Sequence, residues 1–285
     1  MPTTRFQPPR FPTLVVGMLF AGVLYAPAQE PAADATPADA HLEFLLQRQR
    51  QFTLVMQDAN KSRGELQTTP VFRWKNPVSG ADGAVFLWTH QGRPVLLAKT
   101  HLNDQRRCYV ESMTPMTSQR FELREGNSIC WSPASSDAQR HTFPDNDPPA
   151  DSKGLRLTQM RSIARQFRIT SLWGEPTRTE WELRLLTTPL HRYDSPSASV
   201  IDGAIFGYAQ GTNPEAVVIV EALRTDHGPI WEATPARLTG YEVKAWLKDK
   251  MVLEVPYQQQ TRNNGPYFHR HQLPSPYPIP ADPRE

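Results

Sequence analysis

The feature that most constrains the fold is an internal repeat, in which two stretches 120 residues apart have nearly the same sequence. DGAVFLWTHQGRP runs from Asp82 to Pro94, and DGAIFGYAQGTNP runs from Asp202 to Pro214. Upstream, TTPVFRWKNP (68–77) matches TTPLHRYDSP (187–196), and the offset between matched blocks stays between 115 and 123 along the chain. Because the order of blocks is preserved at a nearly constant offset, the sequence indicates duplication of one supersecondary unit.

The periodicity of each half predicts one helix followed by strands. Apolar residues recur at helical spacing from Leu42 to Phe52, and again from Leu157 to Phe167. The period then changes to two, in segments such as AVVIVEAL (216–223), and the turns REGN and LKDK predict a closing hairpin in each half. We therefore predict an α+β fold: a tandem, pseudo-twofold duplication of a helix-plus-antiparallel-sheet unit with about six strands in each copy.

Composition along the chain suggests where these parts begin and end. Proline-rich and alanine-rich stretches separate the periodic segments, and the last of them is expected to be an extended tail without a strand. The predicted division is a signal peptide (1–28), an Ala/Pro-rich linker (29–38), a first repeat unit (39–143), a linker (144–151), a second repeat unit (152–259) and a Pro-rich C-terminal tail (260–285).

The first 28 residues have the pattern of a secretory signal peptide. Arg5 and Arg10 precede the apolar run LVVGMLFAGVLY (14–25), and Ala26 and Ala28 supply a small-x-small cleavage motif. The apolar run is shorter than the ~20 residues of a membrane span, although a retained anchor is the alternative. We expect an exported protein of the periplasm or cell envelope with no membrane span after cleavage.

The charges of the chain balance once this segment is removed. The full sequence has 31 basic and 29 acidic side chains, and the signal segment contains two arginines and no acid, which leaves 29 of each. Such a chain lacks the overall field that attracts nucleic acid. The expected partner is instead a small molecule, a lipid or an envelope protein, and no cofactor is predicted.

Two cysteines, Cys108 and Cys130, lie 22 residues apart. In an exported chain this spacing favours a disulfide between them. A zinc site is not indicated, because a third and a fourth ligand at the usual spacing are missing.

Several of the repeated blocks also resemble a known family. LRLTQMRSIARQF, LRLLTTPLHRYDSP, DGAIFGYAQGTNPE and RWKNP…GADGAVFLW resemble an uncharacterised family of exported planctomycete proteins, over most of the chain from about Phe52 to Pro256. The resemblance implies no activity, cofactor or catalytic residue. Cys108 and Cys130 are a departure from the family pattern.

The residues kept by both halves are candidates for either structure or binding. Arg73 and Arg192 each precede an Asp-Gly pair that begins with Asp82 or Asp202. We favour a structural interpretation, in which each Arg spans a strand pair as a salt bridge and each Asp-Gly forms a turn. In the binding interpretation, the same four residues line two pseudo-symmetric anion sites.

Residues that differ between the halves are the candidates for catalysis. His191 replaces Phe72 at the matched position and could act as a base if Asp194 or Asp202 oriented it, although no nucleophile elbow accompanies them. His269 and His271 could donate two imidazoles to a metal, but two ligands in a proline-rich tail make a weak site, so no metal site is predicted.

The leading hypothesis is a non-enzymatic, exported binding or interaction protein, in which aromatic residues such as Trp88, Tyr208 and Trp231 either line a groove or fill the core. The alternative is a hydrolase or isomerase that uses His191 with Asp194 or Asp202. We assign no catalytic residue.

Overall fold

The computed structural model describes residues 37–76, 80–103, 108–173, 178–195, 199–258 and 263–272. The predicted signal peptide, nearly all of the linker after it and the chain beyond Gln272 lie outside these residues. In the described ranges, no helix is long and apolar enough to cross a membrane.

The described residues of the first half form one helix and two antiparallel sheets. Helix α1 (Pro37–Arg50) is followed at once by β1, the first strand of the smaller sheet. The smaller sheet has the order β1-β7-β8, from β1 (Phe52–Met56), β7 (Phe121–Glu125) and β8 (Ser128–Trp131). The larger sheet contains β2 (Glu65–Leu66), β3 (Phe72–Lys75), β4 (Asp82–His90), β5 (Arg93–Asn103) and β6 (Cys108–Pro115).

One helix and two sheets are also found in the part of the second half that the structure describes. Helix α2 (Lys153–Ala164) begins after Ser152, whose side chain accepts a hydrogen bond from the Leu155 amide and so caps the helix. The smaller sheet has the order β11-β10-β17-β18, from β10 (Phe167–Leu172), β11 (Glu180–Glu182), β17 (Glu242–Leu247) and β18 (Lys250–Val255). The larger sheet contains β12 (Arg184–Leu185), β13 (His191–Ser195), β14 (Val200–Gln210), β15 (Asn213–Thr225) and β16 (Gly228–Arg237).

Each larger sheet gains its last strand from elsewhere in the chain. β9 (His141–Thr142) lies in the predicted first unit but pairs with β16, and β19 (Phe268–Gln272) lies in the predicted tail but pairs with β6. The prediction of a tail without a strand is therefore wrong for residues 268–272. Pairing with β6 gives backbone partners to an edge that would otherwise be open, and it buries Phe268.

The predicted fold class is wrong. Of the described residues, 54% lie in strands and 11% in helices, and the strands form several antiparallel sheets and a half-barrel. The molecule is therefore mostly β, and it is not a duplicated α+β unit with one helix on one sheet. The physical reason is that the strands are many and long. β14 and β15 have 11 and 13 residues, whereas each half has one short helix among its described residues.

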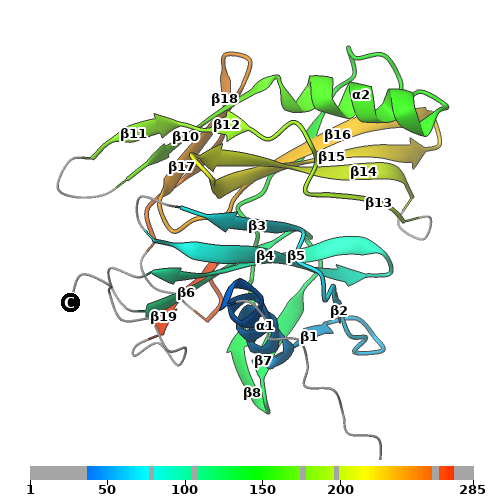
Figure 1. Ribbon diagram of the computed structural model, residues 1–285. Helices are drawn as coiled ribbons and strands as arrows, with labels where there is room; N and C mark the ends of the chain where they lie inside the picture. The colour runs from blue at the N-terminus through cyan, green and yellow to red at the C-terminus, as the bar shows by residue number, and fades with distance from the viewer. Residues whose placement is uncertain are drawn as a thin grey trace, which may run out of the picture. The chain divides into compact units, whose positions relative to one another are not determined.

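Both larger sheets are buried on both faces. In β4, Phe86 packs in the core of the first half, whereas its neighbours Val85 and Leu87 pack in a central core with Ile205 and Val217 of the second half. Figure 1 shows that α1 and α2 lie on the outer sides of the two larger sheets. The central core therefore joins the two halves face to face, which explains why β4 reads as a continuous apolar run.

The aromatic residues named as groove candidates belong to these cores. Trp88, Tyr208 and Trp231 are each less than 5% exposed. The interpretation that they line a groove is wrong, and the alternative that they fill the core is correct.

Candidate functional site

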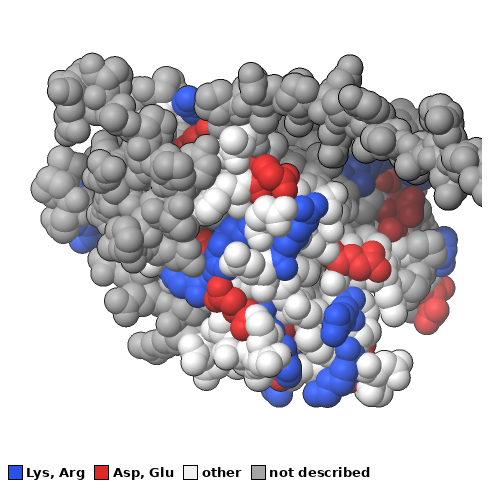
Figure 2. Space-filling model, turned by 60° about the horizontal axis from the view of Figure 1, so that its bottom comes forward, with Lys and Arg blue, Asp and Glu red and all other residues white. Residues whose placement is uncertain are grey.

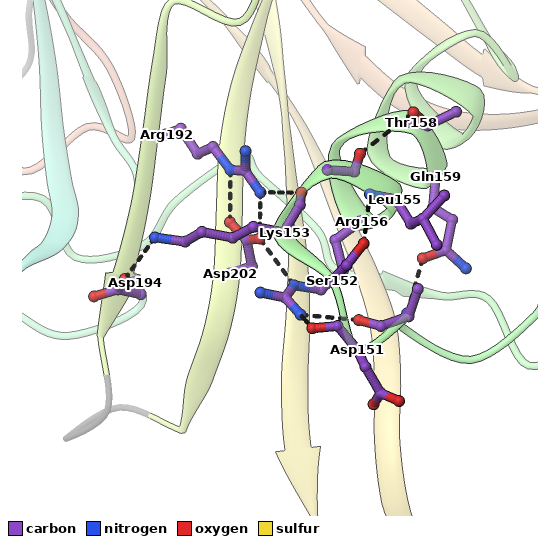
Figure 3. A network of polar contacts seen from close by, with 12 residues as sticks. Asp151, Ser152, Lys153, Leu155, Arg156, Thr158, Gln159, Arg192, Asp194 and Asp202 are labelled. Atoms are coloured by element: carbon purple, nitrogen blue, oxygen red, sulfur yellow. Dashed lines mark hydrogen bonds and ion pairs between the residues drawn. The ribbon is translucent and has the colours of Figure 1, made fainter.

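Asp202 is fully buried and forms ion pairs with two arginines (Figure 3). Arg192 from β13 donates through Nε to Oδ1 at 2.9 Å and through Nη2 to Oδ2 at 2.6 Å, and Arg156 from α2 donates to Oδ2 at 2.9 Å. Burial alone would raise the pKa of Asp202, but the hydrogen bonds and charges of Arg192 and Arg156 lower it below its ordinary value. Asp202 therefore stays ionised as a structural counter-ion.

The same cluster attaches the start of α2 to the sheet. Arg156 donates to the backbone oxygens of Ala150 and Asp151 at 2.8 and 2.6 Å, and Arg192 donates to that of Lys153. Carbonyl and carboxylate oxygens thus satisfy both guanidinium groups. The arrangement explains why an Arg recurs nine or ten residues before an Asp, since in this half the two residues together fasten a helix to a strand pair.

Asp82 is held in a similar but looser way. Its Oδ2 atom lies 3.4 Å from Nη2 of Arg73, on the paired strand β3, and 3.3 Å from Nδ1 of His41 in α1. Burial acts to raise the pKa of Asp82, but His41 and Arg73 outweigh it and lower that pKa. The residues proposed as anion ligands thus pair with each other within each half, Arg73 with Asp82 and Arg192 with Asp202.

The candidate catalytic residues do not assemble. His191 stacks on the Tyr193 ring, at 5.9 Å between centroids and 12° between planes, whereas Asp194 is exposed and pairs with Lys153 Nζ at 3.4 Å. Residues three apart on a strand point to opposite faces, which separates His191 from Asp194. Burial lowers the pKa of His191, and Asp202 is occupied by its arginines.

The disulfide prediction is wrong, because neither Cys108 nor Cys130 forms a disulfide. Cys108 lies in β6 of a larger sheet, and Cys130 lies in β8 of a smaller one. Cys130 Sγ donates to the backbone oxygen of Leu123 at 3.2 Å, and burial raises the pKa of its thiol to about 11. The strand assignment, which sequence spacing does not reveal, keeps the two sulfur atoms apart.

Four aromatic side chains form a row at one end of the sheet β11-β10-β17-β18. This aromatic row consists of Trp181, Trp173, Tyr241 and Tyr257. Trp173 and Tyr241 are stacked at 5.3 Å and 18°, and Tyr241 and Tyr257 at 6.1 Å and 16°, while Trp181 is tilted against Trp173 at 6.4 Å. Trp181 is 41% exposed and Tyr257 50%, so the row reaches solvent at both ends.

Polar groups below the row hold it in place. Trp173 Nε1 lies 3.2 Å from both carboxylate oxygens of Glu215, and Asn213 donates to the same carboxylate. Arg237, which is 2% exposed, donates to the backbone oxygens of Tyr241 and Pro256. These contacts fix the rings on a rigid base, as pre-organised binding surfaces require.

A buried lysine lies near the same carboxylate. Lys99 Nζ donates to the backbone oxygens of Pro214 and Leu238 at 2.8 and 3.4 Å, so it joins β5 to the second half. Burial lowers the pKa of Lys99 to about 8, although Glu215 opposes this shift. Burial likewise raises the pKa of Glu215 against the influence of Lys99. The two groups are coupled and lie below the surface.

Sequence reasoning missed both the aromatic row and Lys99 with Glu215. The rings lie at positions 173, 181, 241 and 257, which no local spacing connects. Lys99 and Glu215 could have been suspected from the sequence, because each is a charged residue in or next to an apolar strand. Lys99 lies in PVLLAKTHL and Glu215 in NPEAVVIVEAL. A charge in such a run is expected to be paired when it is buried.

On one face of the molecule, the charges of the described residues are mixed. On the face shown in Figure 2, basic and acidic side chains are interspersed. This distribution agrees with the balanced composition and offers no broad field of one sign.

No protein-family model, no curated protein sequence and no solved structure matches this chain. The site must therefore be interpreted from its own geometry.

Proposed function

We propose that this protein is a non-enzymatic, exported binding protein of the periplasm or cell envelope, and that the aromatic row holds its ligand. The observation that carries the proposal is the contact between four rings whose outer members are 41% and 50% exposed. Single exposed apolar residues are common, but a supported row of rings is typical of a recognition surface. The signal-peptide pattern supports export.

The chemistry of the row favours a neutral ring ligand. Aromatic faces carry partial negative charge and attract the polarised C–H groups on the flat side of a sugar ring. Trp173 Nε1 is already bound to Glu215 and its ring is stacked on Tyr241, so the aromatic surface open to a ligand is that of the outer rings, Trp181 and Tyr257. Because the chain has balanced charges after signal cleavage, an ionic ligand has no long-range attraction to it. We infer that the ligand is a carbohydrate.

The hydrolase or isomerase alternative has no geometric support. His191 contacts Tyr193, Asp194 pairs with Lys153, and Asp202 is saturated by two arginines. No observation favours this alternative, so we do not propose it.

The test is a titration of residues 29–285 with a panel of neutral oligosaccharides. Binding is measured by tryptophan fluorescence and by calorimetry. Trp181→Ala and Tyr257→Ala should each weaken binding about threefold to tenfold, which corresponds to the ~0.5–1.5 kcal/mol of one aromatic contact. Met251→Ala is the matched control, because Met251 is 45% exposed on the same sheet but lies outside the row.

Native mass spectrometry of the chain from its own envelope fraction gives an independent measurement. A co-purifying sugar that is lost from the Trp181→Ala variant would support the proposal. Saccharide binding unchanged in both aromatic variants, or no binding to any member of the panel, would refute it.

A further inference from the structure

His269 and His271 place two imidazole rings against each other at the edge of the larger sheet of the first half. They alternate on strand β19, so both side chains lie on one side of the strand. Their Nε2 atoms are 3.2 Å apart, and their rings are nearly perpendicular, at 86° with centroids 5.0 Å apart. Pairing of β19 with β6 sets this geometry, since His269 lies opposite Ser112 and His271 opposite Val110.

The second nitrogen of each ring faces another side chain. His269 Nδ1 lies 2.9 Å from Ser112 Oγ, and His271 Nδ1 lies 3.7 Å from Cys108 Sγ. When both rings carry their proton on Nδ1, toward these groups, both Nε2 atoms are left as acceptors 3.2 Å apart, and one bound cation would satisfy both. Orientation of this kind, by a partner on the far nitrogen, is how proteins prepare histidine for a metal.

The separation of the Nε2 atoms matches that of two ligands on one metal ion. Metal–imidazole bonds of about 2.0–2.1 Å at an angle near 90–110° place the two nitrogens about 2.9–3.4 Å apart. The observed 3.2 Å lies within this interval, so both rings could bind one ion without moving. His271 is exposed and His269 half-buried.

The donor set selects the metal. Among the described residues, no group of three or more His, Cys, Asp or Glu side chains is arranged to hold a metal. In this site, the two imidazoles bind the ion together with water oxygens. Two imidazoles with water oxygens suit Cu²⁺, which accepts tetragonal nitrogen and oxygen ligands and binds most strongly of the first-row divalent ions. We propose that His269 and His271 form a solvent-open, two-imidazole Cu²⁺ site on strand β19.

The site is tested by titrating the untagged chain, residues 29–285, with Cu²⁺ under calorimetry and electron paramagnetic resonance. We expect one high-affinity ion per chain and a spectrum with hyperfine coupling to two imidazole nitrogens. His269→Gln and His271→Gln should each weaken binding at least tenfold and leave one coupled nitrogen. His227→Gln is the control, because His227 is exposed on a distant turn and should change nothing.

Two measurements keep the outcome interpretable. His271 is exposed, so its Gln variant should retain the melting temperature of the parent chain, and its Cu²⁺ affinity can be compared directly. Cys108→Ser removes the thiol and should preserve the two-nitrogen spectrum if the sulfur only faces the ring. Binding that is unaffected by either histidine substitution, or a spectrum with a single nitrogen in the parent chain, would overturn the proposal.

Discussion

The Tyr193 ring lies directly over Gly203, so that a Cβ atom at position 203 would come within 2.5 Å of Tyr193 Cζ. The two residues face each other across β13 and β14. From this position, the Tyr193 hydroxyl donates to Glu221 Oε1 at 2.7 Å, and Arg93 of the first half holds the same carboxylate with two hydrogen bonds. The missing side chain at Gly203 thus allows a contact that links β13, β15 and β5.

Substitution of Gly203 should therefore be costly. We expect Gly203→Ala to destabilise the protein by about 1–3 kcal/mol, because the new methyl group overlaps a buried ring. Gly154→Ala is the matched control, since a Cβ there meets no atom within 4 Å and alanine favours the helix α2. Urea unfolding of both variants decides the matter, and equal midpoints would contradict the proposed overlap.

Loss of the Asp202 charge should destabilise the second half strongly. Asp202→Asn leaves Arg156 and Arg192 without their counter-ion, and we expect a loss of about 3–5 kcal/mol in the free energy of unfolding. Asp82→Asn should cost less, because its contacts to Arg73 and His41 are longer, at 3.4 and 3.3 Å. Asp194→Asn, at an exposed ion pair, should change stability by no more than about 0.5 kcal/mol. Equal losses at positions 194 and 202 would refute this ranking.

Acid should destabilise the protein through the same carboxylates. The pKa values of Asp202, Asp82 and Glu125 are lowered in the folded state by their cationic partners, although burial opposes each shift. The unfolded chain therefore binds more protons, and the stabilisation is complete above the ordinary carboxyl pKa and lost as pH falls through the folded values. Unfolding measured from pH 6 to 2 should show this loss. The Asp202→Asn variant should show a shallower slope, and an identical slope would contradict the assignment.

The buried lysine should also make stability rise with pH, but in the alkaline range. The pKa of Lys99 falls to about 8 on folding because burial disfavours its charge, whereas the unfolded value is near 10.5. Between these values the unfolded chain binds more protons, so the cost of the buried charge is relieved and stability rises with pH. Lys99→Met should abolish this rise. A rise of the same size in the variant would show that another group is responsible.

Lys99 and Glu215 should also be coupled energetically. In a double-mutant cycle with Lys99→Met and Glu215→Gln, we expect an interaction energy above about 1 kcal/mol, as found for close buried groups. Additive losses would show that the two groups act independently.

Neither cysteine should form a disulfide in the purified protein. Intact-mass measurement before and after reduction should give the same value, whereas a disulfide would add about 2 Da on reduction. Because the pKa of Cys130 is about 11, its thiol should react slowly with iodoacetamide at pH 8 in the native state and rapidly after unfolding. Fast native alkylation at Cys130 would contradict the buried environment.

Much of the local structure was determined by the sequence alone. AVVIVEAL lies within strand β15, the LKDK turn closes the β17–β18 hairpin, and α2 begins after the capping residue Ser152. Alternation of side chains, β-branching and helix capping act over a few residues, so their signals can be read directly from the chain.

Only the tertiary structure decided how these elements combine. The division of the strands among several sheets, the pairing of β9 with β16 and of β19 with β6, and the separation of Cys108 from Cys130 all depend on contacts across long stretches of chain. The aromatic row and the His269–His271 pair arise in the same way, since pairing between distant strands sets their geometry. Burial and hydrogen bonding between distant segments select one pairing among many with similar local patterns, and no short window of sequence contains that information.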